Sequence, residues 1–249
     1  MLVADIIRER HPMRPTISRD TAGTILLVGA SRGLGLAMAD EFLKKGWAVL
    51  GTVRGRARTK LHDLANEYEG RVEIESLDIT EPAQIATLHD RLSGRNFDIL
   101  FVNAATANPD DATIGEVSTE EFVRVMVTNA LSPMRVVEGL QDLVPANGLI
   151  GIMSSGQGSV SNNEKGRHEV YRGSKAALNQ CMRSYAARHA GEPRALVLMA
   201  PGWIRTDLGG PNAPVGVEEA IPKVVDVLLS QRGKPGLQYL ERDGRTVAW

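Results

Sequence analysis

A glycine-rich turn between an apolar run and a helical pattern constrains this chain more than any other feature. Residues 24–28 (TILLV) are β-branched or aliphatic, as a buried strand requires. Gly29, Gly33 and Gly35 follow, and apolar residues then recur at helical spacing up to Gly46. Glycines at such a junction let the backbone turn tightly and approach a pyrophosphate, which the helix N-terminus can bind. The pattern predicts a dinucleotide-binding unit; the alternative is a tight turn without a ligand.

The rest of the chain continues to alternate between strand and helix. We expect strands at residues 48–53, 72–77, 99–102, 149–153 and 195–199, with helices near 34–45, 81–92, 118–142 and 171–190. Such alternation predicts a single α/β domain, residues 24–249, built on a doubly wound, mostly parallel sheet of the Rossmann type. A ligand should bind beyond the carboxyl ends of the strands. For residues 1–23 we expect a mobile extension, or a start site placed too early, with Met13 as the later one.

Composition excludes several classes of protein. The formal net charge of -1 gives no electrostatic reason to bind nucleic acid or an anionic membrane. No apolar run approaches the ~20 residues of a membrane span, and there is no signal-peptide pattern, so we expect a cytoplasmic protein. Cys181 is the only cysteine, which rules out an internal disulfide, and we expect it in the core. His62, His89 and His189 have no partner at metal-ligand spacing, so no metal site is predicted.

Tyr171 and Lys175 stand four residues apart in a run that reads as helix, so their side chains share one face. A nearby cation stabilises a phenolate, and we therefore expect the pKa of Tyr171 to fall from its usual value near ~10. A fall of roughly 3 units corresponds to about 4 kcal/mol of differential stabilisation. A tyrosine tuned in this way exchanges a proton with a substrate oxygen near neutral pH. The alternative is a chance pairing on an ordinary helix.

Together these features resemble the short-chain dehydrogenase/reductase family over nearly the whole chain, from Thr24 to about Gly236. Seven motifs in the family's order carry the resemblance: Gly29, Gly33 and Gly35; Asp78; Asn103-Ala104-Ala105, in which Ala105 replaces a glycine; Asn129; Ser155; Tyr171 with Lys175; and the segment from Pro201 to Thr206. Residues 153–160 and 242–246 look like the C-factor-like subgroup. That subgroup includes carbonyl reductases and proteins first noted for developmental signalling.

The resemblance implies a catalytic tetrad of Asn129, Ser155, Tyr171 and Lys175. Tyr171 would be the general acid or base, Lys175 would lower its pKa and hold the nicotinamide ribose, and Asn129 would position a water. Ser155 is chosen over Ser154 because the family places the catalytic serine second in the pair, three residues before a glycine, here Gly158. Residues implied to contact the cofactor are Gly29, Ser31, Arg32, Gly33, Leu34, Gly35, Thr52, Arg54, Asp78, Ile79, Asn103, Ala104, Ala105, Tyr171, Lys175, Pro201, Gly202, Ile204 and Thr206.

The stretch after the second strand favours NADP(H) over NAD(H). NAD specificity requires an acid there to hold the ribose hydroxyls, and residues 51–58 (GTVRGRAR) contain none. Thr52 can donate a hydrogen bond, and Arg54 can pair with a 2′-phosphate through its planar guanidinium. Arg32 adds a second cation in the glycine turn, where NADP-preferring members of the family carry one. The alternative is a solvated basic loop.

The predicted activity is hydride transfer between NADP(H) and a small-molecule carbonyl or alcohol. The alternative is a cofactor-sensing or signalling protein with little turnover. Residues 208–216 (LGGPNAPVG) are expected to form a mobile lid because of their glycines and prolines. Whether Trp203 and His168 line the pocket stays open, as does the substrate. Surplus apolar residues on helices 118–142 and 171–190 predict a homo-oligomer, because one face of each helix already covers the sheet. The resemblance implies a homodimer or homotetramer, since members of the family commonly associate through these two helices.

Overall fold

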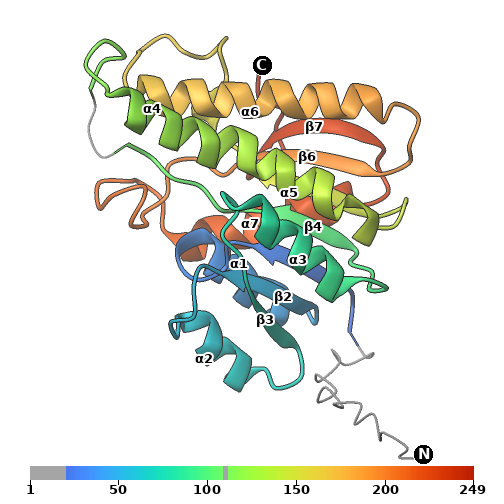
Figure 1. Cartoon of the computed structure of the whole chain (residues 1–249). Coiled ribbons are helices and arrows are strands. Elements are labelled where there is room, and N and C mark those ends of the chain that lie inside the picture. Colours follow the sequence, from blue (N-terminus) through green and yellow to red (C-terminus); the bar gives the residue numbers. More distant parts are fainter. Residues whose placement is uncertain (1–20, 109–111) are drawn as a thin grey trace, which may run out of the picture.

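The computed structural model describes residues 21–108 and 112–249. Within them, seven strands form one sheet in the order β3-β2-β1-β4-β5-β6-β7, and every neighbouring pair is parallel (Figure 1). The strands are β1 (Thr24–Val28), β2 (Ala48–Val53), β3 (Val72–Ser76), β4 (Ile99–Val102), β5 (Leu149–Met153), β6 (Ala195–Ala200) and β7 (Gly236–Glu241). The predicted Rossmann-type domain is confirmed. The expected extension at 1–23 lies almost wholly outside the described residues and stays a prediction.

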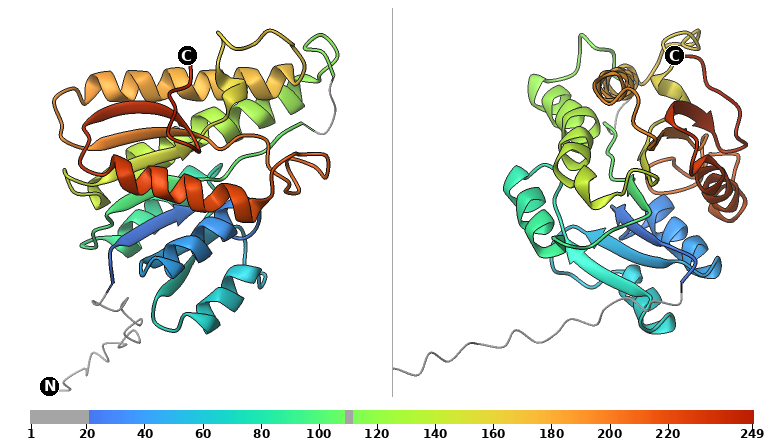
Figure 2. Two further views of the ribbon diagram at one scale, coloured as in Figure 1. Left: turned by 180° about the vertical axis from the view of Figure 1, so that it is seen from behind. Right: turned by 90° about the vertical axis from the view of Figure 1, so that its right-hand side faces the viewer.

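Helices cover both faces of the sheet (Figure 2). One face packs against α3 (Pro82–Leu92), α5 (Ser132–Leu140) and α6 (Glu169–Arg188), and the other against α1 (Gly33–Lys44), α2 (Lys60–Glu67) and α7 (Val217–Gln231). Residues of β1 alternate between the two layers, with Leu26 and Val28 on the first side and Ile25 and Leu27 on the second. A parallel sheet buried on both faces needs near-continuous apolar strands, which is why the strands were readable in the sequence.

The helix expected at 118–142 is interrupted. It consists of α4 (Thr119–Met126), a π-helical turn η1 (Val127–Leu131), α5, and a short 3-10 turn η2 (Gln141–Leu143). Helices α4 and α6 lie side by side (Figure 1). No helix in the described part of the chain is long and apolar enough to cross a membrane.

Three elements and one burial expectation differ from the sequence-based prediction. Helices α2 and α7 and strand β7 were not predicted: α2 buries only Leu61, α7 carries Pro222 in its interior, and β7 is a half-exposed edge strand. Cys181 is exposed, so its predicted core position is wrong. On α6 the sheet-facing positions are taken by Leu178, Met182 and Tyr185, and Cys181 lies outside that stripe.

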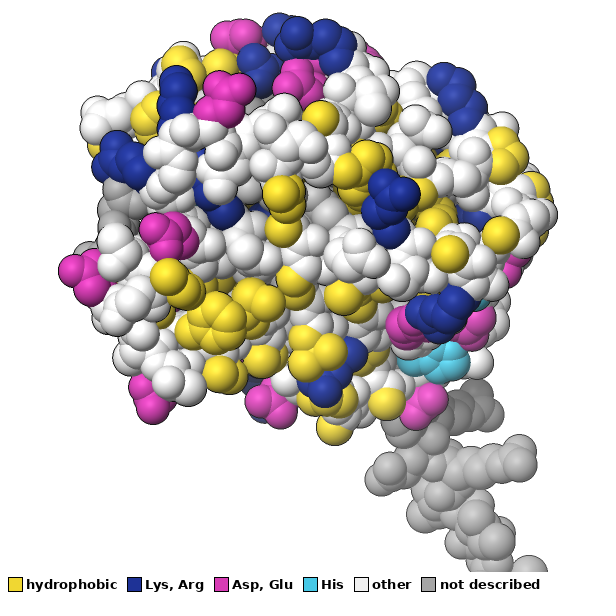
Figure 3. All heavy atoms as spheres, turned by 90° about the horizontal axis from the view of Figure 1, so that it is seen from above, with side chains coloured by type: hydrophobic (Ala, Val, Ile, Leu, Met, Phe, Trp, Pro, Cys, Tyr) yellow, Lys and Arg dark blue, Asp and Glu magenta, His cyan; other side chains and the backbone are white. Residues whose placement is uncertain are grey.

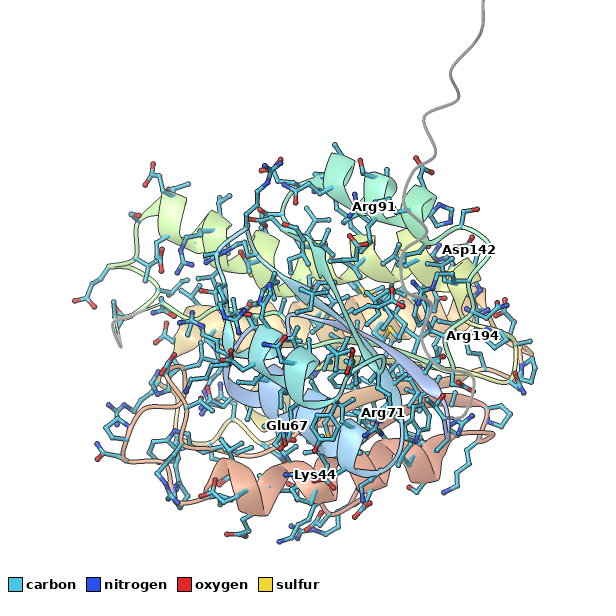
Figure 4. All side chains as sticks on the ribbon, turned by 90° about the horizontal axis from the view of Figure 1, so that it is seen from below. Lys44, Glu67, Arg71, Arg91, Asp142 and Arg194 are labelled. Atoms are coloured by element: carbon cyan, nitrogen blue, oxygen red, sulfur yellow. The ribbon has the colours of Figure 1, made fainter. Side chains whose placement is uncertain are left out.

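The parallel order brings the carboxyl ends of β1, β4, β5 and β6 together at one edge of the sheet. At the underside of the molecule, Lys44, Arg91 and Arg194 come from separate parts of the chain and lie apart from one another (Figure 4). Lys44 pairs with Asp40 at 2.7 Å and Arg91 with Glu75 at 2.9 Å. Both are ion pairs that satisfy these charges within the fold.

Candidate active site

The glycine turn after β1 is packed too closely for side chains. Gly29 has φ +88°, and a Cβ there would lie 2.8 Å from the backbone nitrogen of Ala104. A Cβ on Gly35 would overlap the Gly29 carbonyl oxygen and lie 2.6 Å from Nδ2 of Asn103. That Nδ2 donates to the Gly29 carbonyl at 2.9 Å, and the Gly29 amide donates to Oγ1 of Thr52 at 3.0 Å. The turn is therefore a cradle of bare backbone, as close approach of a pyrophosphate requires.

Helix α1 begins in this turn without a capping side chain. Arg32 occupies the N-cap position with extended backbone and no side-chain cap bond, so the amides of the first turn keep their capacity to bind an anion. Ser31 and Leu34 are half-buried beside the turn. The nearest atom to a Cβ built on Gly33 is Cγ2 of Thr206, at 4.0 Å, so the segment after β6 reaches the turn.

Polar residues predicted to contact the cofactor also lie at the carboxyl ends of β2 and β3 or just beyond them. Asp78 accepts hydrogen bonds from the amide (2.9 Å) and hydroxyl (2.7 Å) of Thr80 through Oδ1. Burial alone would raise the pKa of Asp78, but these hydrogen bonds and the positive charge of exposed Arg54 together lower it. Thr52 is 1% exposed, and its hydroxyl oxygen accepts from the Gly29 amide, so in this structure it supports the glycine turn. Ile79 is buried beside Asp78.

The two arginines predicted to bind the 2′-phosphate are both exposed. Arg32 Nη1 pairs with Oδ2 of Asp207 at 3.2 Å, whereas Arg54 is close enough to Asp78 to lower its pKa. Arg32 lies in the turn itself and Arg54 follows β2, and both side chains are accessible. An exposed ion pair such as Arg32–Asp207 is worth little, about 0–1 kcal/mol, and a phosphate can compete with it.

Tyr171 and Ser155 meet beyond the end of β5. Tyr171 lies in the first turn of α6, half-buried, with its hydroxyl close enough to the side chain of Ser155 to affect its own pKa. Ser155 Oγ also accepts from the Gln157 amide at 3.1 Å. Ser154 is different: its buried hydroxyl donates to Oδ1 of Asn179 at 2.6 Å. Only the second serine of the pair reaches the tyrosine, as expected for a substrate-facing position.

Lys175 lies one turn further along α6, 1% exposed, and its Nζ donates to the Met153 carbonyl at 2.9 Å. The Nζ is 5.8 Å from the centroid of the Tyr171 ring. Burial lowers the pKa of Lys175 to about 7. Burial likewise raises the pKa of Tyr171 to about 12, outweighing the lowering effect of the nearby Ser155 hydroxyl. The predicted fall in the pKa of Tyr171 is therefore wrong for this structure, because removal of water from both groups outweighs their proximity.

Asn129 ties the loop after β4 to α6. Its Nδ2 donates to the Thr106 carbonyl at 2.8 Å and to Ser174 Oγ at 3.0 Å, and its Oδ1 accepts from the Thr106 amide at 2.8 Å. Ser174 Oγ in turn donates to the Tyr171 carbonyl at 2.7 Å. The buried amide is thus committed to protein partners, and its predicted water-positioning role stays a prediction.

The segment after β6 begins with a turn that requires glycine. Gly202 has φ +90°, and a Cβ there would overlap Nη1 of Arg242, which donates to the Pro201 carbonyl at 3.0 Å. Trp203 is 57% exposed, which removes the possibility that it is a core residue, and its Nε1 donates to the Gly209 carbonyl at 2.7 Å.

The predicted lid at 208–216 is folded back on this segment. Buried Ile204 bridges to Val215, and the Arg205 guanidinium donates to the Ala213 and Pro214 carbonyls at 2.8 and 2.9 Å. The mobility expected of the loop stays a prediction. His168, at the start of α6, is exposed with φ +51°.

The structure thus brings Ser155, Tyr171 and Lys175 together, and it places the glycine turn, Ala104 and Asn103 at the same edge. Ala105 is half-buried in the following loop. Sequence reasoning missed the main chain of Thr106 and three polar side chains that support this group: Ser174, Asn179 and Tyr239. Ser174 lies between Tyr171 and Lys175 in the sequence, so its position in that motif could have indicated that it supports the tyrosine. Among the described residues, no three His, Cys, Asp or Glu side chains gather as metal ligands would.

Comparisons with known proteins agree with this geometry. A family model described as enoyl-(acyl carrier protein) reductase matches residues 29–224. C-signal of Myxococcus xanthus is 30% identical over 154 residues, which are 61% of this chain and 92% of that protein.

Two solved structures are similar over almost their whole length. A protein from Burkholderia multivorans, described as a short-chain dehydrogenase/reductase and crystallised with bound NADP, is 68% identical, with a TM-score of 0.90 over 91% of this chain and 99% of the other. A carbonyl reductase from Pseudomonas aeruginosa PAO1 in complex with NADP is 31% identical, with a TM-score of 0.85 and the same coverage.

Proposed function

The chain belongs to the short-chain dehydrogenase/reductase family of oxidoreductases, and on that basis we propose that it transfers hydride between NADP(H) and a carbonyl or alcohol substrate. The observation that carries the proposal is the contact of Tyr171 with Ser155, with Lys175 one helical turn away, at the carboxyl edge of the sheet. Both NADP-bound neighbours support the choice of cofactor. The bound nicotinamide would supply the hydride chemistry, and the protein would supply position and electrostatics.

The residues present fit such a cofactor. Gly29 and Gly35 leave no room for side chains, and the uncapped start of α1 offers amides to a pyrophosphate. Arg54 would face the 2′-phosphate and Asp78 the adenine. Lys175 would hold the nicotinamide ribose.

Tyr171 is suited to donate a proton from Oη to a carbonyl oxygen. Its raised pKa keeps the phenol protonated at neutral pH, which is the form needed for reduction. Ser155 Oγ, beside it, would donate a hydrogen bond to the same substrate oxygen as negative charge develops there. An anion bound near Lys175 would favour the charged form of its amine, and a charged Lys175 would ease loss of the Tyr171 proton.

The alternative, a sensing or signalling protein with little turnover, is not favoured. A protein that only senses a cofactor has no use for a tyrosine, serine and lysine assembled around a substrate position. A turnover assay decides between the two. The purified protein should oxidise NADPH in the presence of aldehydes or ketones from a varied panel. Binding of NADPH without turnover of any member would contradict the proposed reaction.

Cofactor preference is tested at Arg54. NADPH should bind at least about tenfold more tightly than NADH, which corresponds to about 1.4 kcal/mol. Arg54→Asp should reverse the order, because an acid repels the 2′-phosphate and accepts from a free ribose hydroxyl. Arg58→Asp is the matched control, since Arg58 lies in the same loop but pairs with Asp63 at 2.6 Å. Equal dissociation constants for the two cofactors in the unmodified protein, by fluorescence titration, would contradict the assignment.

Assembly as a homodimer or homotetramer is the second part of the proposal. Apolar side chains are exposed on α4 and η1, notably Phe122 (39%), Val123 (48%) and Leu131 (44%), and Figure 3 shows apolar side chains gathered on the face seen from above. We expect light scattering to give at least about twice the monomer mass, and Val123→Glu to halve it, because a buried charge opposes association. Val160→Glu, at another exposed position, should leave the mass unchanged. A monomer at micromolar concentration would count against assembly.

A further inference from the structure

The main-chain carbonyl of Ser155 accepts hydrogen bonds from two directions. One comes from the Gly158 amide at 2.8 Å, within the short 3-10 turn η3 (Gly156–Gly158). The other comes from the hydroxyl of Tyr239, which lies on β7, 84 residues further along the chain. A buried tyrosine hydroxyl usually finds a partner, but here the partner belongs to the residue whose side chain meets Tyr171.

Tyr239 is held rigidly. Its side chain is 1% exposed, and its ring packs against that of Trp249 with the centroids 5.3 Å apart. The Arg183 guanidinium of α6 lies 4.4 Å from the centroid of the Trp249 ring, so Trp249 itself is held by α6. The segment carrying Trp249 folds back on β7, where the Val247 amide donates to the Tyr239 carbonyl at 2.8 Å. Tyr239 is therefore held at its main chain by β7 and the returning segment, and at its ring by Trp249.

The same returning segment also holds the far end of the serine loop. The Trp249 carbonyl accepts from the Ser161 amide at 3.0 Å. Within the loop, Asn179 of α6 donates from Nδ2 to the Gly158 carbonyl at 3.2 Å. Residues 155–161 are thus fastened to β7, to α6 and to the last residues of the chain, and the Tyr239 hydroxyl is the attachment nearest to the reacting group.

We propose that Tyr239 is a positioning residue for catalysis, fixing the peptide of Ser155 so that Oγ stays directed at the Tyr171 hydroxyl and the substrate oxygen. The inference rests on the proposed reductase function. Without the Tyr239 hydroxyl, the Ser155 carbonyl loses its long-range partner, and the peptide can rotate about the 3-10 turn. Small misplacements of a reacting group are costly, up to about 10²-fold for 1 Å.

The first test is Tyr239→Phe in the full chain, which keeps the ring and its packing on Trp249. We expect kcat for carbonyl reduction to fall by about tenfold or more, with KM for the carbonyl and the dissociation constant for NADPH within about twofold. Tyr185→Phe is the matched control: Tyr185 is equally buried, and its hydroxyl donates to Gln141 Oε1 at 2.6 Å, away from the serine loop. An unchanged kcat in Tyr239→Phe would overturn the proposal, as would an equal fall in the control.

A double-mutant cycle separates positioning of Ser155 from general support of the fold. Because Tyr239 is proposed to act through Ser155, Tyr239→Phe should have no further effect on kcat in a Ser155→Ala background. If Tyr239→Phe lowered kcat by the same factor in both backgrounds, Tyr239 would act elsewhere, and the inference would be overturned. Failure of the proposed function looks different: the unmodified protein would then lack carbonyl turnover, or Ser155→Ala alone would leave kcat unchanged.

Discussion

Tyr171→Phe is expected to lower the rate constant for carbonyl reduction by roughly 10²–10⁴, the usual range for a lost general acid. The substitution keeps the ring in the first turn of α6 and removes only the hydroxyl that meets Ser155. NADPH affinity should barely change, because the phenol contributes mainly to the chemical step. Single-turnover rates with saturating NADPH, together with a fluorescence titration of the cofactor, measure the two quantities separately.

The neighbouring serines provide the comparison. Ser155→Ala should lower the rate while leaving NADPH binding alone, because Ser155 contacts the phenol. Ser154→Ala should lower the rate much less, because the Ser154 hydroxyl donates its hydrogen bond to Asn179. If Tyr171→Phe kept most of its reductase activity, the proton would have to come from another group, and the mechanism would be wrong even though the fold is established.

Much of the fold was readable because a parallel sheet with two covered faces needs long apolar strands. Residues 24–28 and 149–153 are buried almost throughout, and both were predicted within a residue. Elements at the edge lacked that signal. β7 is exposed at Gly236 and buried only at Tyr239 and Leu240, so its pattern resembles that of a loop. Tyr239 could not be connected to Ser155 without knowing that β7 returns beside β6.

The site was readable in its residues but not in its electrostatics. Helical spacing correctly placed Tyr171 and Lys175 one turn apart. Spacing does not reveal how much water a fold removes, and here burial raises the pKa of Tyr171 and lowers the pKa of Lys175. The same limit explains the misplacement of Cys181, whose burial depends on which stripe of α6 faces the sheet.

The depressed pKa of Lys175 predicts an unusual dependence of stability on pH. In the unfolded chain this lysine keeps its proton up to about 10.5, whereas in the folded protein it loses it near 7. Between these values the unfolded state binds more protons, so the free energy of unfolding rises with pH, by up to about 1.4 kcal/mol per pH unit. From pH 7 to pH 9 the protein should gain about 2–3 kcal/mol from this group. Tyr171 adds nothing in that window, because it stays protonated in both states.

Lys175→Met removes the titrating amine while keeping a side chain of similar length. The difference in free energy of unfolding between the unmodified protein and this variant, from urea titrations without cofactor, should therefore change by about 2–3 kcal/mol between pH 7 and pH 9. Lys45→Met is the control: Lys45 pairs with Asp226 at 2.8 Å at the surface, and its raised pKa keeps it charged throughout. The difference in free energy of unfolding between the unmodified protein and Lys45→Met should stay constant from pH 7 to pH 9. In the assay, Lys175→Met should also lose both rate and NADPH affinity. A pH-independent difference for Lys175→Met would show that the buried amine keeps its proton at pH 9, so that it would already be charged when the cofactor arrives.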